Sequence, residues 1–101
     1  MKFTSSIHQQ FGIVRLEGRF TFDSHVAFRA STRVLLETPG LQGIILDLEK
    51  VTHMDASSMG AVLLLREAAL PRLTLALRRP SSNVRSLLKI IQFDQLFEIL
   101  P

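Results

Sequence analysis

The sequence predicts a single α/β domain, a mixed β-sheet of about four to five strands covered by helices. Two alternating segments at the N-terminus indicate a β-hairpin, and strand and helix patterns then follow one another three times. That order joins parallel strands through right-handed helical crossovers. A chain of 101 residues, 47% of them hydrophobic, fits one packed domain over residues 1–101, without linker or repeat.

The predicted hairpin is formed by residues 2–9 and 12–18, both of which alternate between apolar and polar side chains. A loop follows, and then a helix that Asp23 or Ser24 can cap and that runs to about Thr38. An apolar stripe along this helix is expected to face the core. The stripe consists of Ala27, Ala30, Val34 and Leu35.

The middle of the chain predicts the centre of the sheet and its principal helix. Residues 42–48 form the most apolar strand-like run and lose alternation, as expected of a central strand buried on both faces. The next helix is predicted from about Ser57 to Leu70, where Pro71 stops it. Because the first half of this helix is apolar on most sides, much of it should be covered.

The last third predicts one more strand and one more helix. Residues 73–77 alternate as a strand, and Ser81, Ser82 or Asn83 can cap the helix after it. The apolar stripe of this helix has clear helical spacing and consists of Val84, Leu87, Leu88 and Ile91. A turn of helix and a short edge strand are expected to close the chain.

Composition excludes several classes of function. The chain has no cysteine, which removes disulfides, thiolate nucleophiles and sulfur-ligated metal sites and makes the cytoplasm the expected compartment. The longest apolar run, residues 59–65, stops at Arg66 and is too short to insert into a membrane. A net charge of +3 raises the question of nucleic acid, but no Trp, Tyr or recognisable motif accompanies it. We therefore expect neither nucleic-acid binding nor membrane insertion.

The most informative stretch is the junction from Val51 to Leu65, where a strand should end and a helix begin. Asp55, Ser57 and Ser58 can each present an oxygen to the unpaired N–H groups of the first helical turn. The partly positive end of a helix also tolerates an anion such as phosphate. The junction is therefore a candidate functional site.

Catalysis is not predicted at this junction. His53, Asp55 and Ser57 are spaced by two, yet a working triad needs the histidine between the other two groups and an oxyanion hole, which the sequence does not offer. The three histidines are scattered without ligand spacing, and no glycine-rich phosphate loop is present. We expect no enzyme activity, no metal and no cofactor.

Residues 55–60 read Asp-Ala-Ser-Ser-Met-Gly, and they resemble the Asp-Ser-Ser/Thr-Gly-Leu-Gly signature of STAS-domain anti-sigma-factor antagonists. Residues 18–23 are similar to the family's loop before its first helix, and residues 87–97 to its C-terminal helix and closing segment. The resemblance covers nearly the whole chain, and the STAS fold has the order of elements predicted above.

The resemblance implies a bacterial, cytoplasmic, non-enzymatic module that takes part in partner switching in transcription regulation. Its implied partner is an anti-sigma factor or switch protein with a GHKL-type serine kinase domain, and a PP2C-type phosphatase reverses the phosphorylation. The implied docking residues are Asp55, Ala56, Ser57, Ser58, Met59, Gly60, Phe20 and Phe22. Met59 and the two phenylalanine rings fit either the core or the interface.

The chain departs from the family pattern at one decisive position. Ala56 stands where the family has its phosphorylated serine, and Ser58 replaces the first glycine. Three explanations are open: Ser57 has become the acceptor, the domain binds its partner permanently, or Ala56 is an engineered replacement that locks the unphosphorylated state. In each case a chain without phosphate at position 56 is predicted to be competent to bind. The alternative function is a STAS subunit of a lipid-transport-like ABC complex that binds an ATPase without phosphorylation.

Overall fold

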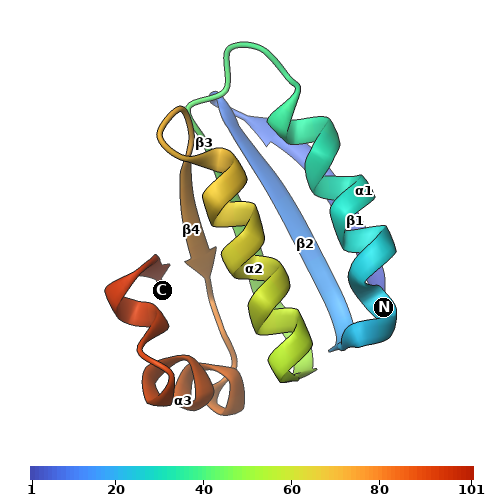
Figure 1. The fold of residues 1–101 in the computed structure, drawn as a ribbon, viewed down its shortest axis with the longest axis vertical. Helices are drawn as coiled ribbons and strands as arrows, with labels where there is room; N and C mark the ends of the chain where they lie inside the picture. Colours follow the sequence, from blue (N-terminus) through green and yellow to red (C-terminus); the bar gives the residue numbers. More distant parts are fainter.

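The computed structural model describes all residues from 1 to 101 and shows one five-stranded sheet in the order β1-β2-β3-β4-β5 (Figure 1). The strands are β1 (Lys2–His8), β2 (Phe11–Phe20), β3 (Gly43–Met54), β4 (Thr74–Arg78) and β5 (Glu98–Leu100). The helices are α1 (His25–Leu36), α2 (Ala56–Ala69) and α3 (Ser82–Ile90), with 3-10 turns η1 (Phe22–Ser24) and η2 (Phe93–Gln95). The predicted α/β class and mixed sheet are confirmed.

Local sequence accounts for the topology. The β1–β2 hairpin turns at Gln9 and Gln10, whose φ angles of 50° and 72° match the turn type that suits the twist of paired strands. All later strands pair in parallel, and a helix or helical segment lies in each crossover. β3 is therefore the central strand, as its apolar run predicts.

Helices α1 and α2 lie side by side over one face of the sheet and run in the same direction (Figure 1). Side chains alternate along β2, so Val14 and Leu16 are fully buried while Arg15 between them is exposed. At the end of β2, Phe20 is also buried, and its ring packs on that of Phe28 in α1 at 4.9 Å between centroids. The core thus lies between the sheet and these helices.

The other face of the sheet has a charged centre. Arg15, Asp47 and Arg78 are register partners on β2, β3 and β4, and their side chains share this face. The Asp47 side chain is fully buried, and its Oδ2 accepts hydrogen bonds from Arg78 (2.9 Å) and Arg79 (2.7 Å). Burial alone would raise the pKa of Asp47, but the hydrogen bond from Arg79, the Glu49 N–H and Arg78 together hold it below its ordinary value.

Two expectations about the elements are corrected by the structure. The face of α1 that packs on the core consists of Phe28, Thr32 and Leu35, and the expected stripe residues Ala27, Ala30 and Val34 are exposed. Only Leu35 was placed correctly. Thr32 can be buried because its hydroxyl donates a hydrogen bond to the Phe28 carbonyl at 2.9 Å, which satisfies the polar group.

The second correction concerns the end of β3. The strand continues past residue 48 to Met54, and Val51 and Met54 are both buried. It remains paired with β2 through two register shifts, between Arg15 and Glu17 and between Gly18 and Arg19. Such irregularities break strict alternation, so the sequence pattern ended the strand too early.

Candidate functional site

The candidate site lies where β2 and β3 end side by side, with Phe20 and Met54 as register partners. Asp55 follows β3 and is the N-cap of α2, with an extended backbone. Its Oδ1 accepts from the Ser58 N–H at 2.8 Å, while Ser58 Oγ accepts from the Asp55 N–H at 3.0 Å. This reciprocal capping box fixes the first turn of α2.

The same carboxylate also fixes a second segment. Asp55 Oδ2 accepts from the backbone N–H of Phe22 at 3.1 Å, across 33 residues of sequence. The turn η1 is thereby held against the start of α2, and the Phe22 ring remains 67% exposed beside the ring of His25. The segment that carries Phe22 therefore lies beside residues 55–60.

These contacts set the electrostatics of Asp55. The Ser58 N–H is the principal cause that holds the pKa of Asp55 below its ordinary value, against the opposing effect of desolvation. The N–H of Phe22 and the hydroxyl of Ser58 lower the pKa further. Asp55 is therefore a fixed anion at neutral pH, directly before Ala56.

The next two residues are accessible. Ala56 is the first residue of α2 and is exposed. Ser57 is half-buried, and its carbonyl oxygen accepts a hydrogen bond from His25 Nε2 at 2.9 Å. The Ser57 hydroxyl takes part in no hydrogen bond. This bond makes His25 part of the site, which sequence reasoning did not anticipate because no local pattern relates residues 25 and 57.

Three of the implied docking residues lie inside the molecule. Phe20 is fully buried, Met59 is buried in the core, and Ser58 is fully buried and occupied by the capping box. Their roles are to pack and to cap, so none of them offers a side chain to a partner. The sequence left open whether Met59 and Phe20 belong to the core or to the interface, and both lie in the core.

Gly60 lies in the second turn of α2 and is half-buried. A Cβ atom built at this position meets no atom within 4 Å, so packing within the chain does not require glycine here. We define the switch surface as Phe22, Asp55, Ala56, Ser57 and Gly60, the accessible residues of this region.

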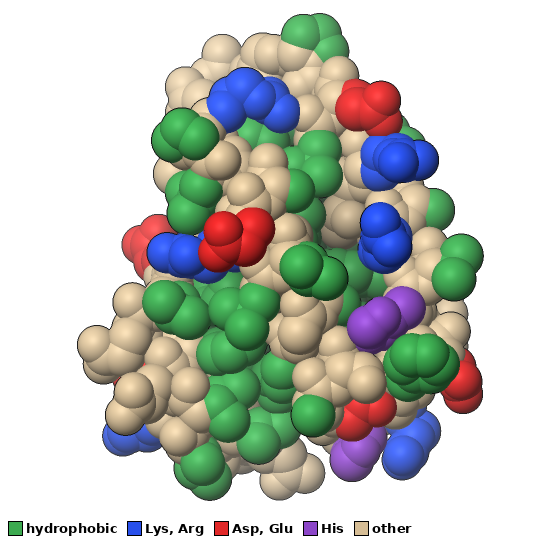
Figure 2. Space-filling model, in the orientation of Figure 1, with side chains coloured by type: hydrophobic (Ala, Val, Ile, Leu, Met, Phe, Trp, Pro, Cys, Tyr) green, Lys and Arg blue, Asp and Glu red, His purple; other side chains and the backbone are tan.

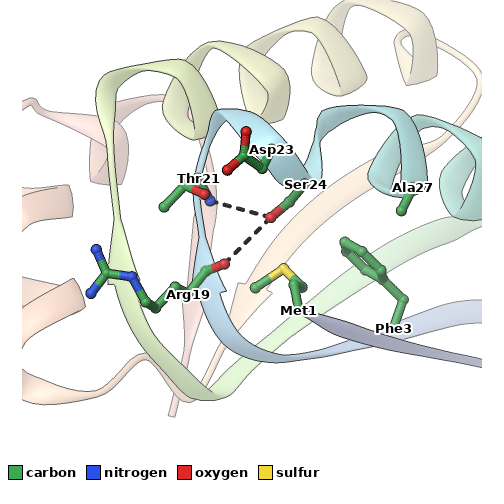
Figure 3. Close-up of a pocket in the computed structure, with 7 residues that line it drawn as sticks. All are labelled: Met1, Phe3, Arg19, Thr21, Asp23, Ser24 and Ala27. Atoms are coloured by element: carbon green, nitrogen blue, oxygen red, sulfur yellow. Dashed lines mark hydrogen bonds between the residues drawn. The ribbon is translucent and has the colours of Figure 1, made fainter.

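A small polar pocket of about 330 Å³ adjoins the switch surface and is shown in Figure 3. Ser24 is central to it: its Oγ accepts from the Thr21 N–H at 3.4 Å and donates to the Arg19 carbonyl at 3.3 Å. These bonds order the segment that carries Phe22. The guanidinium of Arg19 points away from Met1 and Phe3, which line the other side (Figure 3).

The structure assembles no catalytic triad at the junction. The Asp55 carboxylate accepts from backbone N–H groups and makes no hydrogen bond with His53 or with the Ser57 hydroxyl. No group of three or more His, Cys, Asp or Glu side chains is arranged to hold a metal ion. None of the helices combines the length and apolar character that crossing a membrane requires.

The fold and this strand-to-helix junction define a class of protein. The profile of the STAS domain family matches residues 2–101, and the chain belongs to that family. It is 36% identical over 87 residues to a STAS-domain containing protein of Pseudomonas aeruginosa strain UCBPP-PA14, which covers 85% of this chain and 84% of the relative.

Solved structures share the fold. A candidate anti-sigma factor antagonist of Thermotoga maritima aligns with a TM-score of 0.87 at 19% identity, covering 98% of this chain and 86% of that chain. The anti-sigma factor antagonist SpoIIAA, in its unphosphorylated form, aligns with a TM-score of 0.72 at 24% identity, covering 99% of this chain and 87% of that chain. A sulfate transporter family protein of Wolinella succinogenes aligns with a TM-score of 0.78 at 22% identity, covering 94% of this chain and 80% of that chain.

Proposed function

We propose that this chain is a cytoplasmic anti-sigma-factor antagonist, a non-enzymatic module that binds an anti-sigma factor or related switch protein through the switch surface. One observation carries the proposal. Asp55 bonds both the Ser58 N–H of α2 and the Phe22 N–H of η1, so two separate segments form one surface before any partner arrives. A surface ordered in advance loses less entropy on binding.

The proposed partner has a GHKL-type serine kinase domain, and a PP2C-type phosphatase acts on the phosphorylated form. The signature at residues 55–60 supports this assignment, as does the fold shared with SpoIIAA. The partner would contact Phe22, Ala56 and Gly60, which are accessible, while Asp55 keeps the surface in shape.

A phosphate at position 56 would oppose this contact. It would add about −1.5 to −2 charges beside the Asp55 carboxylate. The helix N-terminus repays only about 0.3–1 kcal/mol, whereas desolvating a phosphate against a partner costs several kcal/mol. The methyl group of Ala56 never incurs this cost, so residue 56 leaves the chain competent to bind.

Ser57 is the remaining candidate acceptor. Its hydroxyl is half-buried and free of hydrogen bonds, whereas the Ser58 hydroxyl is buried and bonded to Asp55. Phosphorylation of Ser58 would require the capping box to break. The two positions at which the switch can operate are therefore 56, after substitution by serine, and 57.

The test is the intact mass of the chain and of its Ala56→Ser variant after incubation with ATP and the kinase-domain partner. We expect only Ala56→Ser to gain a phosphoryl group, and we expect the phosphorylated variant alone to release the partner. If the unmodified chain gains the group and Ser57→Ala prevents it, the acceptor is Ser57. If neither protein is modified, the phosphorylation switch is rejected.

One observation favours a second function, a STAS subunit of an ABC lipid-transport-like complex that binds an ATPase. Ala56 offers no phosphoacceptor at the exposed start of α2, and such a complex needs none. Co-purification distinguishes the two functions. A kinase-domain switch protein recovered with the tagged chain supports the first, and an ABC ATPase supports the second.

A further inference from the structure

A groove of about 670 Å³ separates α1 from α2 on the helical side of the molecule. Its floor includes Phe28 and Leu65, which are buried in the core. Apolar side chains at its edges are exposed to solvent: Val26 of α1 is 83% exposed, and Leu64 of α2 is 66% exposed. In Figure 2 some apolar side chains lie in and beside the hollow between the two helices, and a larger group lies on the other side of α2, toward α3. The chain thus leaves an apolar surface between the two helices that its own core does not use.

The charge of the groove has a single sign. Arg29 and Arg33 line it from α1, four residues apart and therefore on one side of the helix, and no acidic residue lines it. Both are exposed, and neither is among the arginines that form ion pairs with carboxylates. Basic side chains follow α1 in Figure 2. The groove therefore favours an occupant with negative charge on the edge that faces α1.

The shape of the groove favours a helix. α1 and α2 run in the same direction side by side, and their 12 and 14 residues give lengths of about 18 and 21 Å. The gap between two such helices accepts the side-chain ridge of a third helix of about three turns. Apolar residues at i, i+3, i+4 and i+7 of that helix would cover Val26 and Leu64.

We propose that this groove binds an amphipathic, acidic helix of a partner protein. Its apolar face would fill the groove, and carboxylates one turn apart would pair with Arg29 and Arg33. The groove reaches the switch surface, because His25 lines its end and donates to the Ser57 carbonyl at 2.9 Å. The inference rests on the proposed function in that the helix belongs to the partner that contacts the switch surface.

The test uses designed peptides and the ¹⁵N-labelled full chain. One peptide is an amphipathic helix of about 14 residues with a leucine face and two glutamates at i and i+4. The other carries lysines in place of those glutamates. We expect amide shifts in α1 and α2 and about tenfold tighter binding of the glutamate peptide, a preference that added salt reduces. Equal affinities for the two peptides, or shifts confined to other elements, would overturn the proposal.

Exposed residues supply matched variants that the fold should tolerate. Arg29→Glu with Arg33→Glu is expected to reverse the peptide preference. Leu64→Asn should weaken both peptides, while Val34→Asn should change neither, because Val34 is exposed on α1 but does not line the groove. Equal effects of Leu64→Asn and Val34→Asn would reject the groove. Shifts that depend on protein concentration without peptide would identify a second copy as the occupant and also reject the proposal.

Failure of this inference can be told apart from failure of the proposed function. If a kinase-domain partner binds the chain and phosphorylation of Ala56→Ser releases it, but Leu64→Asn leaves its affinity unchanged, only the groove inference fails. If the acidic peptide binds in the groove and no kinase-domain partner is found, only the proposed function fails.

Discussion

At the scale of single residues, Asp55 determines the candidate site. One oxygen of its carboxylate caps α2 and the other holds Phe22, so both segments lose their common anchor if the side chain is removed. Capping at this junction could be predicted, but Asp55, Ser57 and Ser58 all fitted the pattern, and the structure shows that Asp55 is the cap. The bond to Phe22 joins residues 33 positions apart and has no local signal.

Gly60→Ala separates a structural role from a binding role. Alanine should stabilise α2 by about 1 kcal/mol, because its helix propensity is higher, and the added methyl group meets no neighbour. If a partner packs against Gly60, the same change should weaken binding. Urea unfolding and a binding titration measure the two effects. Glu67→Ala, at an exposed site further along α2, serves as the control and should leave affinity unchanged.

Residue-level prediction failed where the environment is set by distant segments. Phe20 and Met59 fitted either core or surface in the sequence, and both are buried. Phe20 is buried by the ring of Phe28 from the next helix, a contact that spacing does not encode. Phe22, two residues later, stays exposed because its backbone is held by Asp55 while its ring points outward beside His25.

At the scale of elements, the order of strands and helices could be predicted, while the inner face of α1 could not. This helix carries two apolar stripes, and the sequence favoured the one with Ala30 and Val34, which are exposed. The buried stripe includes Thr32, a polar residue that a search for apolar spacing does not count as core, although its hydroxyl is satisfied by the Phe28 carbonyl. The outer stripe of α1 continues into Val26, which borders the groove.

The elements should differ in their resistance to hydrogen exchange. β3 is bonded on both sides and largely buried, whereas β1 is an edge strand on which only Phe3 is partly buried. We expect the amides of β3 to exchange slowest, near the rate of global unfolding, and those of β1 that point away from β2 to exchange fastest. Mass spectrometry of peptides after deuteration measures this order. Equal protection of β1 and β3 would contradict it.

At the scale of the whole molecule, stability should fall in acid. Asp47 and Asp55 both have a folded pKa below the ordinary value of 3.8. A lowered folded pKa means that the unfolded chain binds more protons, so this stability is complete above about pH 4 and is lost as pH falls through the folded pKa. The urea midpoint from pH 7 to pH 2 measures it. Asp47→Asn and Asp55→Asn should each reduce the fall of the urea midpoint between pH 4 and pH 2. A midpoint of the unmodified chain that stays unchanged down to pH 2 would contradict the prediction.

The fold was predictable as a whole because several local signals agreed. The hairpin, the apolar central strand and the capped helices all indicate one α/β arrangement, and the sheet of five strands has it. The charged cluster around Asp47 was not predictable. Its arginines come from β2 and from the end of β4, and only the register of the sheet brings them together.

That cluster has a consequence for the behaviour of concentrated solutions. Two copies could stack their uncovered sheet faces only by stripping water from the Arg15 and Arg79 side chains, which are 51% and 40% exposed around the buried Asp47 carboxylate. Dehydrating such charges is costly, which disfavours stacking of this face on its own copy. Self-association through this face of the sheet is therefore expected to be weak even at high protein concentration.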